Sequence, residues 1–196
     1  MKLLSSAFVV CLSVFSAVGS ETAQTNGKLS LGDPIPSVTA SDQDGKTVDL
    51  ANTAKDGYTL VYFYPKAMTP GCTAQACSLR DAYQSLQEKG VKVYGVSLDT
   101  VDAQKEFQAK EGLPFELLSD TDHKVTAAFG VPLIKNSFAA RQAYLFKEGR
   151  LVWLDTKAST DKQAADVLSV LSGNSHTTID AANRTDAGAK KSNAAK

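Results

Sequence analysis

The sequence predicts an α/β domain in which a central mixed sheet is flanked by helices. The aromatic and β-branched run Tyr58–Tyr64 is followed by a helical pattern and then by a second apolar strand, Val91–Ser97. This β-α-β order predicts a parallel pair. Nearer the C-terminal end, Ala143–Phe146 and Leu151–Leu154 flank a Lys-Glu-Gly-Arg turn and predict an antiparallel hairpin. Both kinds of pairing in one domain make the expected sheet mixed.

The first elements follow from turn and proline signals. Leu31–Pro36 contains two prolines, which stiffen an extended entry into the domain. Asp44-Gly45 is a turn signal, and it precedes a short predicted strand at Thr47–Leu50.

A helix is predicted directly after Tyr58–Tyr64. Thr69 is suited to the N-cap and Pro70 to the first helical position, while Gly90 is suited to end the helix. Apolar residues recur at helical spacing between these limits, at Ala76, Leu79, Tyr83 and Leu86.

Shorter elements are expected after Val91–Ser97. Val101–Glu111 is predicted to be a helix capped by Thr100, and Phe115–Leu118 a short strand. A short helix carrying Val125 and Phe129 is predicted to end at Gly130.

The last helix carries its own start and stop signals. Thr160-x-x-Gln163 is predicted to be a capping box, because a threonine hydroxyl and a glutamine three residues later can satisfy each other's backbone N–H groups. Apolar residues follow at helical spacing, and Gly173 is expected to stop the helix.

The two ends of the chain differ in composition from the middle. Lys2 followed by the uncharged, mostly apolar run Leu3–Val18 and then small residues predicts a signal peptide over residues 1–20. A membrane anchor is the alternative, but the run is shorter than the roughly 20 residues that a span needs and serines interrupt it. We therefore expect a periplasmic or secreted protein with a flexible leader over 21–28, one domain over 29–173 and a disordered polar tail over 174–196.

The charge balance excludes some classes of partner. The 196 residues hold 21 Lys+Arg and 21 Asp+Glu. Nucleic acids and acidic membranes attract basic patches, so we expect no nucleic-acid partner, and no membrane partner after signal cleavage.

Two cysteines, Cys72 and Cys77, remain once the signal segment with Cys11 is removed. A bridge between them would close a very short loop and would constrain the unfolded chain little, so the pair indicates chemistry rather than architecture. The expected cap at Thr69 places Cys72 in the first turn of a helix, where backbone N–H groups and the helix dipole favour the nucleophilic thiolate. Gly71 lets the backbone approach a small substrate. The alternative is that Cys72 is an inert buried cysteine.

Other site types have little support in the sequence. The histidines, His123 and His176, lie in a different predicted helix and in the tail, so a Cys–His dyad is not expected. A closed zinc site needs more ligands than two thiolates, and neither a metal nor an organic cofactor is predicted.

At these residues the chain resembles a known family. Pro65-x-x-x-Thr69-x-x-Cys72 resembles the peroxidatic signature of peroxiredoxins. The segments 76–81, 94–99 and 117–120 resemble the bacterioferritin-comigratory (PrxQ) subgroup of that family. The resemblance covers residues 29–173 and implies a thioredoxin-like fold of the peroxiredoxin type.

The resemblance also implies a role for each matching residue. Cys72 would be the peroxidatic cysteine and Cys77 the resolving one. Thr69 would hydrogen-bond the peroxide and Cys72, Pro65 would shield the thiolate from water, and Arg141 would lie against the thiolate. A surface ion pair is the alternative for Arg141.

The function implied by the resemblance is a thiol-dependent peroxidase that reduces hydrogen peroxide and organic hydroperoxides. Cys72 would become a sulfenic acid, an intramolecular disulfide with Cys77 would follow, and a thioredoxin-like dithiol reductant would recycle it. A monomer or weak dimer is expected. The export signal and the polar tail depart from many members of the subgroup, which leaves the reductant open.

Three rival functions stay open on the sequence alone. An exported thiol–disulfide oxidoreductase would share the fold, but it normally carries Cys-x-x-Cys, whereas four residues separate Cys72 from Cys77. A copper-binding chaperone would want a suitably placed histidine. A non-catalytic binding module is the third, and peroxide consumption by the reduced protein separates all of them from a peroxidase.

Overall fold

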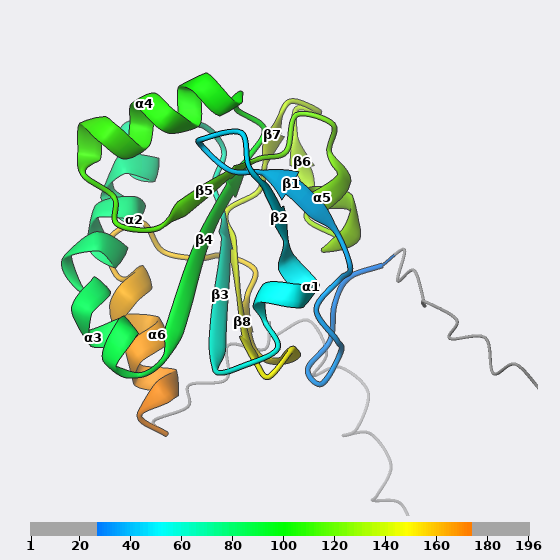
Figure 1. The fold of residues 1–196 in the computed structure, drawn as a ribbon, viewed down its shortest axis with the longest axis vertical. Coiled ribbons are helices and arrows are strands. Elements are labelled where there is room, and N and C mark those ends of the chain that lie inside the picture. The colour runs from blue at the N-terminus through cyan, green and yellow to red at the C-terminus, as the bar shows by residue number, and fades with distance from the viewer. Residues whose placement is uncertain (1–26, 174–196) are drawn as a thin grey trace, which may run out of the picture.

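The computed structural model describes residues 27–173, and within them a seven-stranded mixed sheet has the strand order β2-β1-β5-β4-β3-β8-β9 (Figure 1). The predicted signal peptide, most of the leader and the tail over 174–196 lie outside the described residues. The strands of this sheet are β1 (Thr39–Ser41), β2 (Thr47–Asp49), β3 (Tyr58–Phe63), β4 (Val91–Ser97), β5 (Glu116–Ser119), β8 (Gln142–Lys147) and β9 (Arg150–Asp155).

The centre of the sheet follows the sequence prediction. β3 pairs in parallel with β4 and antiparallel with β8, so Phe63 lies opposite both Val96 and Gln142. β4 pairs in parallel with β5, and β8 forms the predicted hairpin with β9. All residues of β3 after Tyr58 are buried, as expected of a central strand that is covered on both faces.

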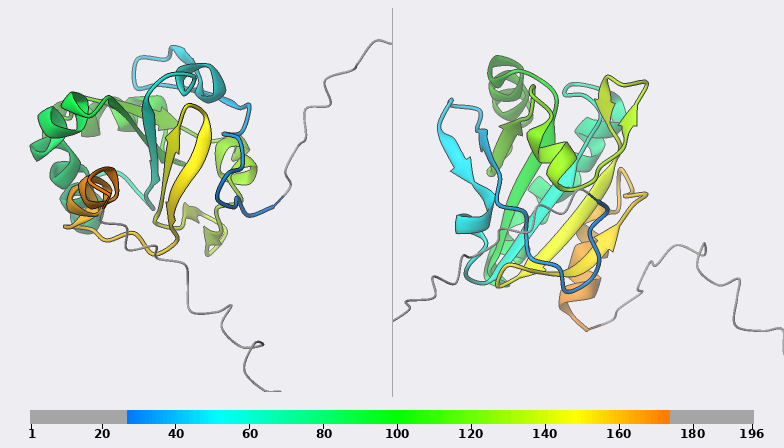
Figure 2. Two further views of the ribbon diagram at one scale, coloured as in Figure 1. Left: turned by 90° about the horizontal axis from the view of Figure 1, so that it is seen from below. Right: turned by 90° about the vertical axis from the view of Figure 1, so that its right-hand side faces the viewer.

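Helices cover both faces of the sheet. α2, α3 and α6 lie together on one side, and α1 and α5 lie on the other (Figures 1 and 2). Two apolar cores result, one containing Tyr62 and Phe107 and the other containing Phe63 and Phe129. The helices are α1 (Leu50–Thr53), α2 (Pro70–Asp81), α3 (Tyr83–Glu88), α4 (Val101–Glu111), α5 (Lys124–Ala128) and α6 (Gln163–Leu171).

The helix expected between Thr69 and Gly90 is in fact two helices. Ala82, with φ −99° and ψ 8°, leaves the helical conformation and separates α2 from α3. After this break the ring of Tyr83 packs on Phe115, with 5.8 Å between ring centroids, while Leu86 stays fully buried. The break at Ala82 thus adjoins the contact of Tyr83 with Phe115, which helical spacing alone cannot reveal.

Of the two side-chain caps predicted for later helices, one is confirmed and one is wrong. Thr100 accepts a hydrogen bond from the Ala103 N–H at 3.3 Å and caps α4 as predicted. The capping box at Thr160 does not form, because Lys162 occupies the N-cap of α6 without a side-chain cap bond. Instead the hydroxyl of Ser78, on α2, accepts from the Ala164 N–H at 3.3 Å.

Several short elements differ from the prediction in their bounds or were not predicted. The strand predicted at Thr47–Leu50 ends at Asp49, whose carboxylate caps α1 by accepting from Asn52 N–H at 3.1 Å. The expected strand at Phe115–Leu118 is shifted by one residue, to Glu116–Ser119. Three unexpected strands are β1 and the small pair β6 (Leu133–Ile134) and β7 (Phe138–Ala139).

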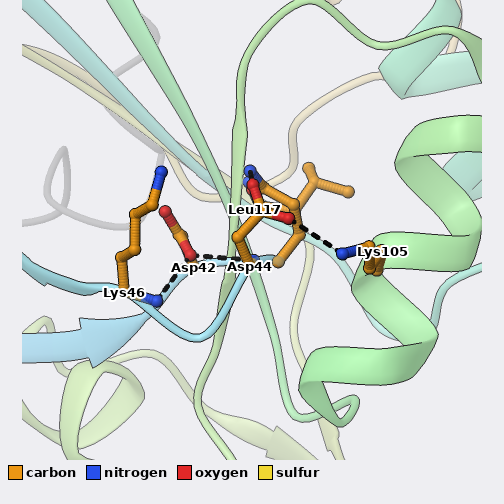
Figure 3. A network of polar contacts seen from close by, with 6 residues as sticks. Asp42, Asp44, Lys46, Lys105 and Leu117 are labelled. Atoms are coloured by element: carbon orange, nitrogen blue, oxygen red, sulfur yellow. Dashed lines mark hydrogen bonds and ion pairs between the residues drawn. The ribbon is translucent and has the colours of Figure 1, made fainter.

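A polar turn fastens β1 and β2 to the rest of the domain (Figure 3). Asp42 accepts hydrogen bonds from the backbone N–H groups of Asp44 and Lys46, at 2.8 and 2.9 Å. Lys105 on α4 lies 3.1 Å from the Asp44 carboxylate, and Gln43 accepts from Leu117 N–H on β5 at 3.0 Å. Side chains here complete backbone bonding where β1 pairs with β5 at one residue only.

Across residues 27–173, no helix is both long and apolar enough to cross a membrane.

Candidate active site

Cys72 lies in the first turn of α2, beyond the carboxyl end of β3. The residue is 1% exposed and belongs to the core that includes Tyr62 of β3 and Tyr64, directly after that strand. Pro70 occupies the first helical position, as predicted, so the helix begins two residues before Cys72. The thiol is thus near backbone N–H groups that have no partner within the helix and near the positive end of its dipole.

Arg141 is brought to Cys72 by strand pairing. It directly precedes β8, whose first residue, Gln142, lies opposite Phe63 at the end of β3. One guanidinium nitrogen donates to Cys72 Sγ at 3.3 Å, and another donates to Gln75 Oε1. The contacts of Arg141 are therefore with the candidate nucleophile and a buried amide, which is not the surface ion pair kept as its alternative.

Gly71 lies beside this contact. A Cβ atom at this position would meet the Arg141 guanidinium at 3.4 Å and a methyl group of Thr160 at 3.4 Å. Both distances are those of ordinary van der Waals contact, so a Cβ atom would touch the group that contacts Cys72 without displacing it. The access that Gly71 would give a small substrate stays a prediction, and in the structure its neighbours are Arg141 and Thr160.

The loop Pro65–Thr69 connects β3 to α2 in a strained conformation. Met68 has φ +62°, which costs a non-glycine residue roughly 1–2 kcal/mol. Thr69 occupies the N-cap of α2, as predicted, but its hydroxyl donates to the Lys66 carbonyl at 2.9 Å and makes no cap bond with the helix. Pro65 is half-buried, and its shielding role stays a prediction.

A network of hydrogen bonds from β4 and α4 holds the loop Pro65–Thr69 in place. Asp99, just after β4, accepts a hydrogen bond from Ala67 N–H at 2.8 Å and another from the Ser97 hydroxyl at 2.7 Å. Gln104 on α4 donates to Ser97 Oγ at 2.9 Å and accepts from the phenol of Tyr64. The loop is thus anchored to β4 through Asp99 and Ser97, and to α4 through Gln104, and this anchorage maintains the strained residue.

Cys77 lies on the same helix but in different surroundings. Its thiol donates to the Glu111 carboxylate, with 3.7 Å between Sγ and Oε2. Arg80, one turn along α2, donates to the backbone carbonyl of Glu111 at 2.6 Å and pairs with Asp81 at 2.8 Å. Burial raises the pKa of the Cys77 thiol, and Glu111 and Asp81 raise it further while Arg80 opposes them. Cys77 therefore holds its proton more firmly than an ordinary thiol.

Comparison with known proteins agrees with this geometry. Residues 31–153 match the AhpC/TSA family. The chain is 39% identical over 148 residues to chloroplastic peroxiredoxin Q of Oryza sativa subsp. japonica, which covers 74% of this chain and 68% of that protein. It is 50% identical over 103 residues to peroxiredoxin Bcp of Escherichia coli strain K12, covering 53% of this chain and 65% of that protein.

Solved structures give the same result. The peroxidoxin BcpB of Mycobacterium tuberculosis matches with a TM-score of 0.69 and 29% identity, over 74% of this chain and 97% of that one. The bacterioferritin comigratory protein of Xanthomonas campestris matches with a TM-score of 0.67 and 30% identity, over 74% and 97%.

The chain belongs to the peroxiredoxin family. The subgroup is that of peroxiredoxin Q and Bcp, and the activity is that of a thiol-dependent peroxidase. The thioredoxin-like fold of the peroxiredoxin type, with its mixed sheet and flanking helices, is confirmed.

Four polar residues of this peroxiredoxin site were missed in the sequence. Gln75 lies three residues after Cys72, so helical spacing could have placed it on the same face. Asp99 follows a buried strand at the edge where α/β sheets bind ligands, which is also a readable signal. Glu111 and Gln163 reach the site only through tertiary packing.

Among residues 27–173, no group of three or more His, Cys, Asp or Glu side chains is arranged to hold a metal ion.

Replacing Glu111 with glutamine is expected to make Cys77 of this peroxiredoxin more reactive near neutral pH. The variant removes a negative charge that disfavours the thiolate, so the pKa of Cys77 falls and its thiolate forms at lower pH. The measurement is the pH dependence of Cys77 alkylation by iodoacetamide, followed by mass spectrometry. Glu106→Gln, an exposed change on the same helix, is the control and should leave the profile unaltered. An unchanged profile in Glu111→Gln would contradict the assignment.

Oxidation of the two cysteines is expected to unwind the first part of α2. Both lie within this helix, and in a regular helix a separation of five residues places their Cα atoms about 8.6 Å apart. A disulfide needs Cα atoms within about 7 Å. Hydrogen exchange across Thr73–Leu79 should therefore be faster in the oxidised peroxiredoxin than in the reduced one. Equal protection, with the Cys72–Cys77 bond verified by mass spectrometry, would show that the helix tolerates the bond.

Proposed function

We propose that Cys72 is the peroxidatic cysteine and that Cys77 resolves it. The Cys72 thiolate attacks one oxygen of a hydroperoxide, the O–O bond breaks, and the leaving oxygen takes a proton to become water or an alcohol. Cys72 is left as a sulfenic acid. The sulfur of Cys77 then attacks that of Cys72, the disulfide forms, and the sulfenic oxygen departs as water.

The observation that carries this assignment is the contact of 3.3 Å between the Arg141 guanidinium and Cys72 Sγ in the first turn of α2. A guanidinium keeps its charge throughout the working pH range, so it favours the thiolate and the charge that moves onto the leaving oxygen. The Thr69 hydroxyl donates its hydrogen bond to the Lys66 carbonyl, which leaves its oxygen lone pairs to accept from the O–H of a hydroperoxide. Pro65 limits the access of water to the thiolate in this proposal.

The proposed substrates are hydrogen peroxide and organic hydroperoxides, and the proposed reductant is a thioredoxin-like dithiol protein. Alkyl peroxide reduction is ascribed to the Xanthomonas campestris relative, which supports the second substrate class. The reductant exchanges its dithiol for the Cys72–Cys77 disulfide. Because both cysteines belong to one helix, one chain completes the cycle, consistent with a monomer or weak dimer.

The test is peroxide consumption by the reduced full chain. Hydrogen peroxide and tert-butyl hydroperoxide should each be consumed once per chain without reductant, and continuously when thioredoxin, its reductase and NADPH are added. No loss of either peroxide would refute the proposal. Turnover that needs no thiol reductant would refute the disulfide cycle.

We also propose that the protein is exported and acts in the periplasm or outside the cell. The charged Lys2 and the apolar run Leu3–Val18 support cleavage near Ser20 or Glu21. The intact mass of the exported protein should therefore lack the first 19 or 20 residues. An exported protein that still contained residues 1–19 would contradict the cleavage.

A further inference from the structure

A chain of buried amides leads from the candidate nucleophile to the last helix. Arg141 contacts both Cys72 Sγ and Gln75 Oε1, and the Nε2 of Gln75 donates to Gln163 Oε1 at 2.8 Å. Gln75 and Gln163 are both fully buried, at 0% exposure. Gln163 thus lies two hydrogen bonds away from the guanidinium that contacts the thiol.

The direction of this chain is determined by the charge of Arg141. A guanidinium can only donate, so Gln75 must present its oxygen to Arg141 and its nitrogen to Gln163. Gln163 must then accept with its own oxygen. Its Nε2 is buried without a hydrogen-bond partner among the described residues, so the bond from Gln75 governs its orientation.

The local structure of α6 makes Gln163 available for this contact. The predicted capping box would have turned its side chain back toward the helix start. Because Ser78 of α2 caps the Ala164 N–H instead, Gln163 is free to point inward, on the same face as the fully buried Val167. Two contacts, at Gln75 and Ser78, therefore join the start of α6 to α2.

We propose that Gln163 is a positioning residue which, through Gln75, holds Arg141 against Cys72. It touches neither the thiol nor the substrate, and the proposal rests on the function of Cys72 proposed above. Two further titratable groups that interact with Cys72 are the phenols of Tyr62, on β3, and of Tyr64, directly after it. Burial raises the pKa of both phenols, so they stay neutral and Arg141 is the charged group that acts on the thiol.

Gln163→Met has a similar length but no acceptor oxygen, and Gln163→Asn keeps the amide but is one methylene too short. In both variants Arg141 loses its fixed orientation. The reaction of Cys72 with hydrogen peroxide should slow on the order of tenfold, the scale seen when outer partners of an active-site group are removed. Alkylation of Cys72 by iodoacetamide, measured at one fixed pH, should also slow. Val167→Ala, a core change on the same face of α6, is the control and should alter stability without altering either readout.

A double-variant cycle separates positioning from a structural role. Once Arg141→Ala is present, adding Gln163→Met should have no further effect on the reaction of Cys72, because the two residues act in series. Full additivity, or unchanged alkylation in both Gln163 variants, would overturn the proposal. If the wild-type chain consumed no peroxide, the proposed function would fail, while the alkylation profiles would still decide whether Gln163 acts through Arg141.

Discussion

Cys72→Ser is expected to abolish peroxide consumption, while Cys77→Ser still consumes about one equivalent. A serine hydroxyl does not ionise near neutral pH, so it cannot act as the nucleophile. Cys77, whose pKa is raised by burial and by Glu111, cannot replace the lost thiolate. In Cys77→Ser the first step proceeds, and the Cys72 sulfenic acid then persists until an added thiol reduces it. The measurement is peroxide loss against protein concentration in a single mixing experiment, with mass spectrometry of the product.

The two variants control each other, because each removes one sulfur from α2. Cys72→Ser must remain folded, as judged by circular dichroism, for its inactivity to count. Full turnover in Cys72→Ser would exclude Cys72 as the nucleophile. Multiple turnovers by Cys77→Ser without an added thiol would exclude Cys77 as the resolving residue.

Arg141→Ala should slow sulfenic acid formation by about 10²–10³-fold, the range found when one donor to a developing negative charge is lost. The 3.3 Å contact with Cys72 Sγ disappears, and iodoacetamide alkylation of Cys72 at one fixed pH should then be slower, because a neighbouring cation no longer favours the thiolate. Arg141→Lys should fall between, since a lysine restores the charge but not the forked contact with Gln75.

Arg150→Ala is the matched control, because Arg150 is an exposed arginine at the start of β9. Its rate and its alkylation profile should equal those of the wild type. Were Arg141→Ala to behave like Arg150→Ala in both measurements, the contact with Cys72 would have no role in the reaction.

The parts of the fold that were predicted correctly are those determined by neighbours in sequence. Tyr58–Phe63 is a strand because every residue suits a position covered on both faces, and Thr100 caps α4 with a bond that spans three residues. The errors arose where distant residues decide. The break at Ala82 adjoins the contact of Tyr83 with Phe115, and nothing within the helix itself marks it.

The candidate site shows the same division. Cys72 and its place in the first turn of a helix could be predicted from the residues that precede it, and Arg141 from a resemblance. Gln163 could not be predicted, because its partner is 88 residues away and its local pattern suggested a cap. Glu111 reaches Cys77 only because the C-terminal end of α4 lies against α2.

The anchorage of the loop Pro65–Thr69 has a consequence for the return half of the cycle. Asp99 holds this loop through β4 and α4, and none of its described bonds involves α2. When α2 unwinds, this loop beside Cys72 therefore keeps its shape. After reduction, only the few residues between Thr69 and Leu79 have to refold into a helix, and they do so beside a loop that has kept its conformation. We therefore expect thiol exchange with the reductant, rather than refolding of this segment, to limit the rate at which each cycle restarts.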